Sequence, residues 1–339
     1  MNQIRHLPPG VKDFLFEEAR RRRQVERLLT GLLEQRGYQE IITPTFEYGE
    51  VFLAASREEE LKNGLPEKMY RFLDRNGQFL ALRSDFTAQI ARIAATRLQG
   101  MEPPIHIYYS GKVFRAEAQH AGKSREKWQV GFEILGDGGF EADTRAICTI
   151  LDAFAALSLR QVRIAIGHIG FFDGVLNGSV KLASEARRDI KYLIERKDVE
   201  GLRLLCEQLD LPSGLTRALM QIPALHGDAS ILQRARQITA QPSAIAAIEH
   251  LEKLWQNIAE HPGADSVFID LSEVEGMGYY TGIMIKAFAA GIGQEVGSGG
   301  RYDDLVARFG RAMPAVGFSF DVDLLVEASR NASQSGGAS

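Results

Sequence analysis

Strand-like sequence patterns lie on both sides of a long stretch in which every pattern is helical. Residues 171–261 contain short amphipathic segments with apolar residues at helical spacing, separated by Pro, Gly and Asp. Strand patterns precede this stretch, and further ones follow it at residues 266–271, 280–288 and 315–320. The simplest organisation places both sets of strands in one domain. The sequence therefore predicts a mostly antiparallel α+β domain interrupted by a helical insertion.

The N-terminal part begins with a strongly amphipathic segment. Residues 17–36 carry apolar side chains at helical spacing opposite a heavily charged face, and Gly37 is expected to follow the end of this helix. A run with strand character follows at residues 38–43 and stops at Pro44. The apolar stripe of the helix consists of Val25, Leu28, Leu29, Leu32 and Leu33.

A hairpin and a capped helix are expected next. Residues 69–83 are typical of two strands, and the turn between them contains Asn-Gly at residues 76–77, which is a strong hairpin signal. Ser84 or Asp85 is then expected to cap a helix over roughly residues 86–98.

Three further strands are predicted at residues 105–109, 112–117 and 128–135, and the last of these alternates cleanly. One of its faces is apolar and is expected to meet the core: Trp128, Val130, Phe132 and Ile134. The opposite face carries Gln129, Gly131 and Glu133.

The polar face of this strand could bind a zwitterion. If the strand predicted at residues 112–117 pairs with it, Arg115 and Glu117 join Gln129 and Glu133 on one surface. Carboxylates can hold an ammonium, Arg can hold a carboxylate, and a Glu/Gln pair can hold a ring N–H. From the pattern alone, an ordinary solvated sheet face is the favoured explanation of the same residues.

Other segments carry less chemical information. The Gly-rich residues 297–301 are expected to form a loop between the last two strands, where Arg301 could bind an anion or simply follow a tight turn. Tyr279 and Tyr280 at the start of a strand are typical of half-buried packing. We find no nucleophile triad and no spacing of metal ligands, so no metal or cofactor is expected.

Composition excludes several classes of protein. The 339 residues are 45% hydrophobic and 25% charged, which fits a globular protein of about two domains. The formal net charge of −4 argues against a dedicated nucleic-acid binder. Cys148 and Cys206 lie far apart, so a disulfide framework and a zinc site are not expected, and a reducing cytoplasm fits. No membrane span or signal peptide is expected, and the small polar residues 331–339 are expected to be disordered.

Taken together, these segments resemble the catalytic core of the histidyl-tRNA synthetase family, which has a class II aminoacyl-tRNA synthetase fold. The resemblance covers nearly the whole chain in order: LPPGVKDFL, GYQEIITPTFE, LRSDFTAQIAR, VFRAE, WQVGFEILG, GYYTG, SGGRYDDL and PAVGFSF. It implies a homodimer built on the first helix and the strand that ends at Pro44. It also implies a histidine pocket formed by Asp85, Thr87, Arg115, Gln129, Glu133, Tyr279 and Tyr280.

Two departures from the synthetase motifs concern ATP. Glu275 stands where those enzymes carry an Arg that contacts the reacting carboxylate and α-phosphate. Leu324 stands where they carry an Arg that binds the γ-phosphate. The chain also ends soon after Leu324, so no anticodon-binding domain is expected.

A synthetase-like core that keeps histidine recognition but loses ATP chemistry resembles the ATP phosphoribosyltransferase regulatory subunit family. This implies a non-catalytic partner of a short-form catalytic subunit, needed for the first step of histidine biosynthesis, with L-histidine as the effector of feedback inhibition and with no tRNA. The expected divisions are a synthetase-like core at 1–170 and 263–330, a helical insertion at 171–262, and the tail at 331–339.

Two other functions remain open from the sequence. One is a histidine-activating enzyme, which would have to tolerate both Glu275 and Leu324. The other is an RNA-binding sensor on the same fold, which the net charge of −4 and the short basic loops argue against. ATP–pyrophosphate exchange would reveal the enzyme, and salt-dependent tRNA binding would reveal the sensor.

Overall fold

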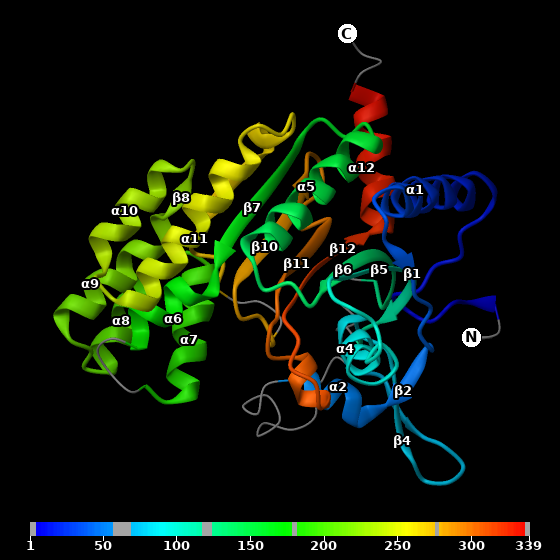
Figure 1. The fold of residues 1–339 in the computed structure, drawn as a ribbon, viewed down its shortest axis with the longest axis horizontal. Helices are drawn as coiled ribbons and strands as arrows, with labels where there is room; N and C mark the ends of the chain where they lie inside the picture. Colours follow the sequence, from blue (N-terminus) through cyan, green and yellow to red (C-terminus); the bar gives the residue numbers. More distant parts are fainter. Residues whose placement is uncertain (1–4, 57–68, 117–123, 178–181, 275–277, 336–339) are drawn as a thin grey trace.

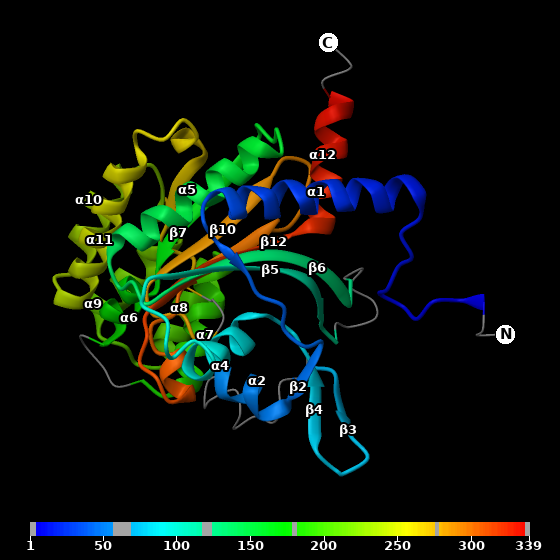
Figure 2. The ribbon, with the colours of Figure 1, turned by 45° about the vertical axis from the view of Figure 1, so that its right-hand side comes forward.

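A computed structural model describes residues 5–56, 69–116, 124–177, 182–274 and 278–335 of the chain. Its centre is a large twisted sheet with helices packed on it, and a smaller sheet lies below (Figure 1, Figure 2).

The large sheet has nine strands within the described residues. Their order across the sheet is β1 (Gln39–Glu40), β5 (Ile105–Phe114), β6 (Glu126–Leu135), β12 (Ala315–Asp321), β11 (Gly297–Arg301), β10 (Ile283–Ala289), β7 (Val162–His168), β9 (Val267–Asp270) and β8 (His226–Gly227). Neighbours are antiparallel except for the parallel pairs β1–β5 and β7–β9. Strands from both sides of the helical stretch lie in this one sheet, which confirms the predicted mostly antiparallel α+β fold.

The prediction of two separate strands at residues 105–109 and 112–117 is wrong. β5 runs without a break through residues 110–111, which pair with Val130 and Gln129 of β6. Gly111 is not a turn residue; a Cβ there would lie 2.6 Å from the guanidinium of Arg83. The glycine therefore marks close packing inside a strand.

The predicted Gly-rich loop at residues 297–301 is also wrong, because this segment is strand β11 between β10 and β12. Its glycines are required by the neighbouring strands. A Cβ at Gly299 would overlap the carbonyl oxygen of Gly317 on β12, and one at Gly300 would press on the carbonyl of Ile283.

One face of the sheet packs against helices that include α1 (Phe16–Gln35), α5 (Phe140–Ala156) and α12 (Val322–Ser335). The predicted first helix is confirmed, and Gly37 after it has a φ of 82°. Val25, Leu29 and Leu33 are buried in the main core. Most of the stripe that was expected at a dimer interface therefore packs inside the chain itself, and Leu28 is its exposed member.

The smaller sheet lies on the opposite side of the large one. It contains, within the described residues, β2 (Phe46–Tyr48), β4 (Phe79–Leu82) and β3 (Arg71–Leu73), next to helices α2 (Gly49–Ala55) and α4 (Thr87–Thr96). The β3–β4 pair confirms the predicted hairpin, with Gly77 at a φ of 77°. Figure 2 shows this hairpin projecting from the body of the molecule.

The stretch between β7 and β9 is helical, as predicted, apart from the short strand β8. Its helices are α6 (Ile169–Asn177), α7 (Ser184–Glu195), α8 (Val199–Gln208), α9 (Ser213–Gln221), α10 (Ser230–Ile238) and α11 (Pro242–Ile258). α11 packs on α5 and α6, so the helical region shares one apolar core with the sheet. Short 3₁₀ helices are η2 (Ile222–Ala224), η3 (Ala264–Ser266) and η4 (Val306–Phe309).

The division of the chain at residues 170 and 262 stays a prediction. In the expected disordered tail, residues 331–335 differ from expectation because they continue helix α12, and residues 336–339 lie outside the described residues.

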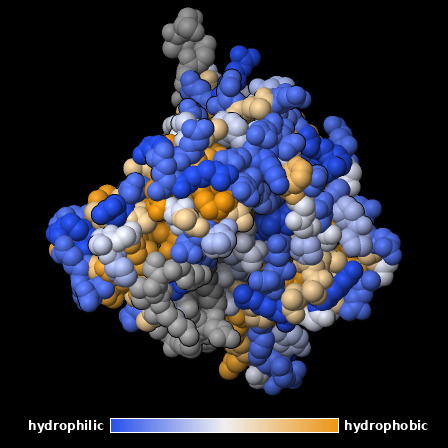
Figure 3. Space-filling model, turned by 60° about the vertical axis from the view of Figure 1, so that its left-hand side comes forward, coloured by the Kyte–Doolittle hydropathy of each residue, from blue (hydrophilic) through white to orange (hydrophobic). Residues whose placement is uncertain are grey.

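A search of the described helices finds none with the length and apolar character that a bilayer crossing requires. The face shown in Figure 3 is mostly hydrophilic, with small separate apolar patches.

Candidate functional site

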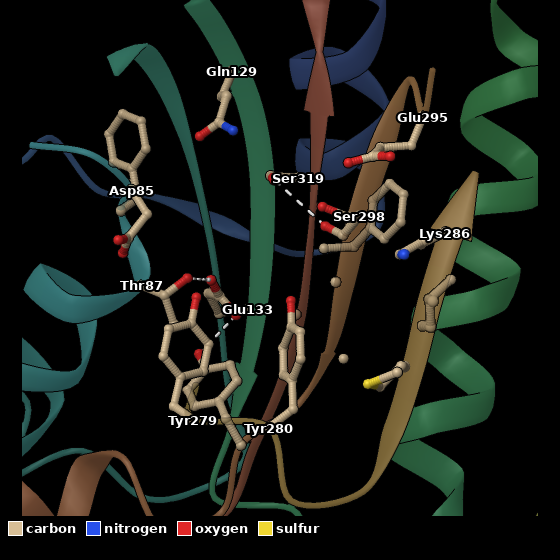
Figure 4. Close-up of a pocket in the computed structure, with 18 of the residues that line it drawn as sticks. Asp85, Thr87, Gln129, Glu133, Tyr279, Tyr280, Lys286, Glu295, Ser298 and Ser319 are labelled. Carbon is tan, nitrogen blue, oxygen red and sulfur yellow. Dashed lines mark hydrogen bonds between the residues drawn. The ribbon is translucent and has the colours of Figure 1, made fainter. Parts of the chain in front are cut away.

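All seven side chains proposed for the ligand pocket line one cavity of about 470 Å³ (Figure 4). They are Asp85, Thr87, Arg115, Gln129, Glu133, Tyr279 and Tyr280. The cavity lies on the face of the central strands away from α1, α5 and α12. Segments that are distant in sequence therefore converge on one half-buried, polar space, which is typical of a ligand site.

The floor of the cavity is a row of residues that face each other across four strands. Glu133 on β6 pairs with Gly317 on β12, which pairs with Gly300 on β11 and then with Met284 on β10. A Cβ on Gly317 would overlap the Glu133 carboxylate, and one on Gly300 would lie 3.1 Å from the ring of Tyr280. The two glycines thus provide the depth of the cavity.

Glu133 is a buried carboxyl group at this floor, with an exposed fraction of 2%. The hydroxyl of Tyr302 donates to its Oε2 at 2.7 Å, and that of Thr87 donates to its Oε1 at 3.2 Å. Burial raises the pKa of Glu133 to about 8, although both hydrogen bonds favour the ionised form. The group can therefore change its protonation state near neutral pH.

Asp85 and Thr87 lie at the start of α4, where the chain leaves β4. The backbone N–H of Ala88 donates to Asp85 Oδ1 at 3.1 Å, so Asp85 is the residue that caps this helix, as one of the two predicted alternatives. Burial raises the pKa of Asp85, and the Ala88 hydrogen bond and the charge of Arg115 oppose that rise. Asp85 is thus held in place while its carboxylate also faces the cavity.

Arg115 and Gln129 form another part of the wall. Arg115 follows β5, and its Nε donates to the carbonyl of Ser84 at 3.1 Å. Gln129 projects from β6, two positions along the same face from Gly131. Glu117, which was expected on this surface, lies outside the described residues.

Tyr279 and Tyr280 precede β10 and form a cluster of rings with Tyr302. The ring centroids are 5.2 Å apart for Tyr279–Tyr280 and 5.8 Å apart for Tyr279–Tyr302. Burial raises the pKa of all three phenols, so they stay neutral and can donate hydrogen bonds.

Tyr302 was not predicted as a site residue. Gly300 and Tyr302 are two positions apart, so the period of a strand would have placed both on the cavity face if residues 297–301 had been predicted as a strand. Arg301 faces away and is 3% exposed, with Asp143 at 2.7 Å and Asp303 at 3.0 Å. The suggestion that Arg301 binds an anion is therefore wrong, because internal partners occupy its guanidinium.

Of the two positions at which the synthetases carry an arginine, Leu324 lies within the described residues. Leu324 lies on α12, where its backbone N–H donates to Asp321 Oδ1 at 3.2 Å and its side chain packs against the main core. Glu275 lies outside the described residues. Among the residues that the structure describes, no group of three or more His, Cys, Asp or Glu could hold a metal ion.

The chain is similar to known proteins over most of its length. The family model for histidyl-tRNA synthetase matches residues 10–325. The chain is 36% identical to the ATP phosphoribosyltransferase regulatory subunit of Moorella thermoacetica over 94% of its own length and 81% of that protein. It is 37% identical to the protein of that name from Syntrophotalea carbinolica, over 93% of its own length and 73% of the relative.

A solved structure shows the same fold. It is the crystal structure of an ATP phosphoribosyltransferase regulatory subunit/histidyl-tRNA synthetase from Bacillus halodurans C, with 31% identity and a TM-score of 0.85. The match covers 96% of this chain and 83% of that one.

Proposed function

The chain belongs to the ATP phosphoribosyltransferase regulatory subunits, a histidyl-tRNA synthetase-like family, and we propose that it confers feedback inhibition by binding free L-histidine in the cavity. Its role is that of a regulatory, non-catalytic subunit in histidine biosynthesis. The observation that carries the histidine proposal is the set of groups on one cavity: a carboxylate at Asp85, a guanidinium at Arg115 and a buried carboxyl at Glu133.

These groups match the three polar parts of histidine. Asp85 is proposed to take the α-ammonium and Arg115 the carboxylate, so that each ligand charge meets an opposite one. Glu133 and a tyrosine hydroxyl are proposed to take the imidazole N–H at the floor. Gln129 and Thr87 complete the polar wall. A site of this kind selects against amino acids without the ring N–H, because a buried polar group would then lose its partner.

Assembly is the second part of the proposal. The name of the family implies a catalytic ATP phosphoribosyltransferase subunit as partner, and we propose that this is the short form. We also propose a homodimer within the complex. Leu28 on α1 is 41% exposed and Ile42 after β1 is 83% exposed, and both are among the exposed apolar side chains of that region that a second copy could cover. The proposed location is the cytoplasm, without tRNA.

Reconstitution tests this function. The chain and the short catalytic subunit of the same genome are mixed, and ATP phosphoribosyltransferase activity is followed as L-histidine is added. We expect a hetero-oligomer by light scattering, activity above that of the catalytic subunit alone, and inhibition by histidine. Separate species with no gain in activity would refute the regulatory proposal, and an active complex indifferent to histidine would refute the feedback part.

A further inference from the structure

The cavity extends beyond the groups proposed for histidine. Figure 4 shows Lys286, Glu295, Ser298 and Ser319 on the side away from Asp85 and the tyrosines. We call this the outer part of the cavity, defined by these four residues and Glu195. It is built from β10, β11, β12, the segment before β11, and the last residue of helix α7.

The whole cavity has room for more than one amino acid. Pockets of about 300–1,000 Å³ ordinarily take ligands of drug size, and this one has a volume of about 470 Å³. Shape alone therefore does not restrict the ligand to free histidine. The charges of the outer part must decide which larger ligands can enter.

The cation of the outer part is already neutralised. Lys286 Nζ lies 2.7 Å from Glu195 Oε1 and is also paired with Glu273. Burial alone would lower the pKa of Lys286, but the two carboxylates outweigh it and raise the pKa, so the ammonium stays charged and paired. Glu295 adds a third carboxylate at the exposed mouth.

Among the described lining residues, Arg115 is the other cationic side chain, and it belongs to the proposed histidine site. The outer part thus has carboxylates in excess over cations. A phosphate group placed there would meet like charges in a half-buried space, where solvent screens them poorly.

We propose that Glu195 is a specificity-determining residue, which together with Glu295 excludes phosphate-bearing ligands from the cavity. This inference deepens the proposed function and rests on it, because it explains why the effector would be the free amino acid. It also gives the helical region a role at the site, since Glu195 ends α7. The competing explanation is an ion pair that only fastens α7 to β10.

The test measures binding of inorganic tripolyphosphate to the full chain by calorimetry at low salt. We expect Glu195→Gln/Glu295→Gln to bind tripolyphosphate at least tenfold more tightly than wild type, because two repelling carboxylates are removed and, of the two that pair with Lys286, only Glu273 remains. Adding Lys286→Met should remove the gain. Glu200→Gln is the matched control, because Glu200 is an exposed carboxylate of the same helical region, paired with Arg203.

The proposal would be overturned if the double variant bound tripolyphosphate no more tightly than wild type. It would also be overturned if Glu200→Gln gained the same affinity, or if the gain in the double variant survived Lys286→Met. If the Glu195 variants fail to fold, Glu295→Gln alone must show at least a threefold gain. Histidine is titrated separately into wild type: its failure to bind would refute the proposed function, whereas the tripolyphosphate series judges only the exclusion.

Discussion

The hydroxyl of Tyr302 lies 2.7 Å from Oε2 of Glu133, although β12 lies between β6, which carries Glu133, and β11, which Tyr302 directly follows. This hydrogen bond passes over Gly317, the residue of β12 that pairs with Glu133. Because Gly317 has no side chain, the carboxyl group can occupy the space above it. The position of the Glu133 carboxyl, the proposed acceptor of the imidazole N–H, thus depends on a glycine at position 317.

Gly317→Ala should therefore disturb the site directly. The new methyl would overlap the Glu133 carboxylate, which would have to leave Tyr302 and Thr87. We expect histidine affinity to fall at least tenfold, or about 1.4 kcal/mol, by calorimetry. Gly214→Ala is the control, since its methyl would meet nothing within 4 Å. Unchanged affinity in Gly317→Ala would show that the Glu133 geometry is irrelevant to binding.

The buried Glu133 carboxyl should make stability depend on pH. Burial raises its pKa to about 8 in the folded chain, whereas the group has its usual value of 4.5 when unfolded. Between pH 4.5 and about 8 the Glu133 carboxyl therefore binds a proton more strongly in the folded state than in the unfolded state. Its contribution to the free energy of unfolding is complete below pH 4.5 and is lost as pH rises through about 8. We expect the unfolding free energy of wild type, minus that of Glu133→Gln, to fall over this range in urea titrations.

The free energy of unfolding is compared as a difference between the two proteins because His168 also makes stability depend on pH. Burial lowers the pKa of His168 to about 3, so its contribution is present above its usual 6.5 and is lost as pH falls. Both proteins keep His168, and the subtraction removes its effect. A difference that stays flat or rises with pH would contradict the raised pKa of Glu133.

The proposed homodimer can be tested at Ile42. Its side chain is 83% exposed next to β1, and a charge there would be buried if a second copy covered it. We expect Ile42→Asp to convert a dimer into a monomer in light scattering while the melting temperature of the monomer stays close to that of wild type. Glu50→Asp, on the exposed start of α2, is expected to leave the dimer intact. A wild-type monomer, or a dimer that tolerates Ile42→Asp, would argue against this interface.

The chain should not activate histidine. At position 324 a leucine packs against the core, so no cationic side chain is available there, and loss of one electrostatic donor costs about 10²–10³-fold in other enzymes. We expect no histidine-dependent ATP–pyrophosphate exchange, with a histidyl-tRNA synthetase as positive control in the same assay. Robust exchange by the purified chain would overturn its assignment as a non-catalytic subunit.

Local periodicity was enough to predict which residues of β6 share one face. The alternation over residues 128–135 placed Val130 and Phe132 in the core and Gln129 and Glu133 on the opposite face, and the structure has this arrangement. The Asn-Gly turn and the cap at Asp85 depend on neighbouring residues in the same way. Each of these patterns is determined within a few residues of the chain.

The features that the sequence analysis missed depend on contacts between distant segments. The glycines at 297–301 suggested a loop, because the neighbouring strands that require them are not visible in the local pattern. Tyr302 was missed with that strand. Likewise, the periodicity of α1 shows an apolar face but not what covers it, and Val25 and Leu29 meet the chain's own core. The character of the Gln129–Glu133 face as a buried cavity wall also needed Tyr302 and α4 above it.

Calorimetric titration of L-histidine into wild type and Glu133→Ala measures whether the Glu133 carboxyl binds the ligand. We expect wild type to bind histidine and Glu133→Ala, folded as judged by circular dichroism, to bind it more weakly by about 1–3 kcal/mol, because the ring N–H loses its buried acceptor. The same variant should need more histidine to inhibit the reconstituted complex. Equal affinity and equal inhibition in the two proteins would refute histidine binding at Glu133 and place the feedback site elsewhere.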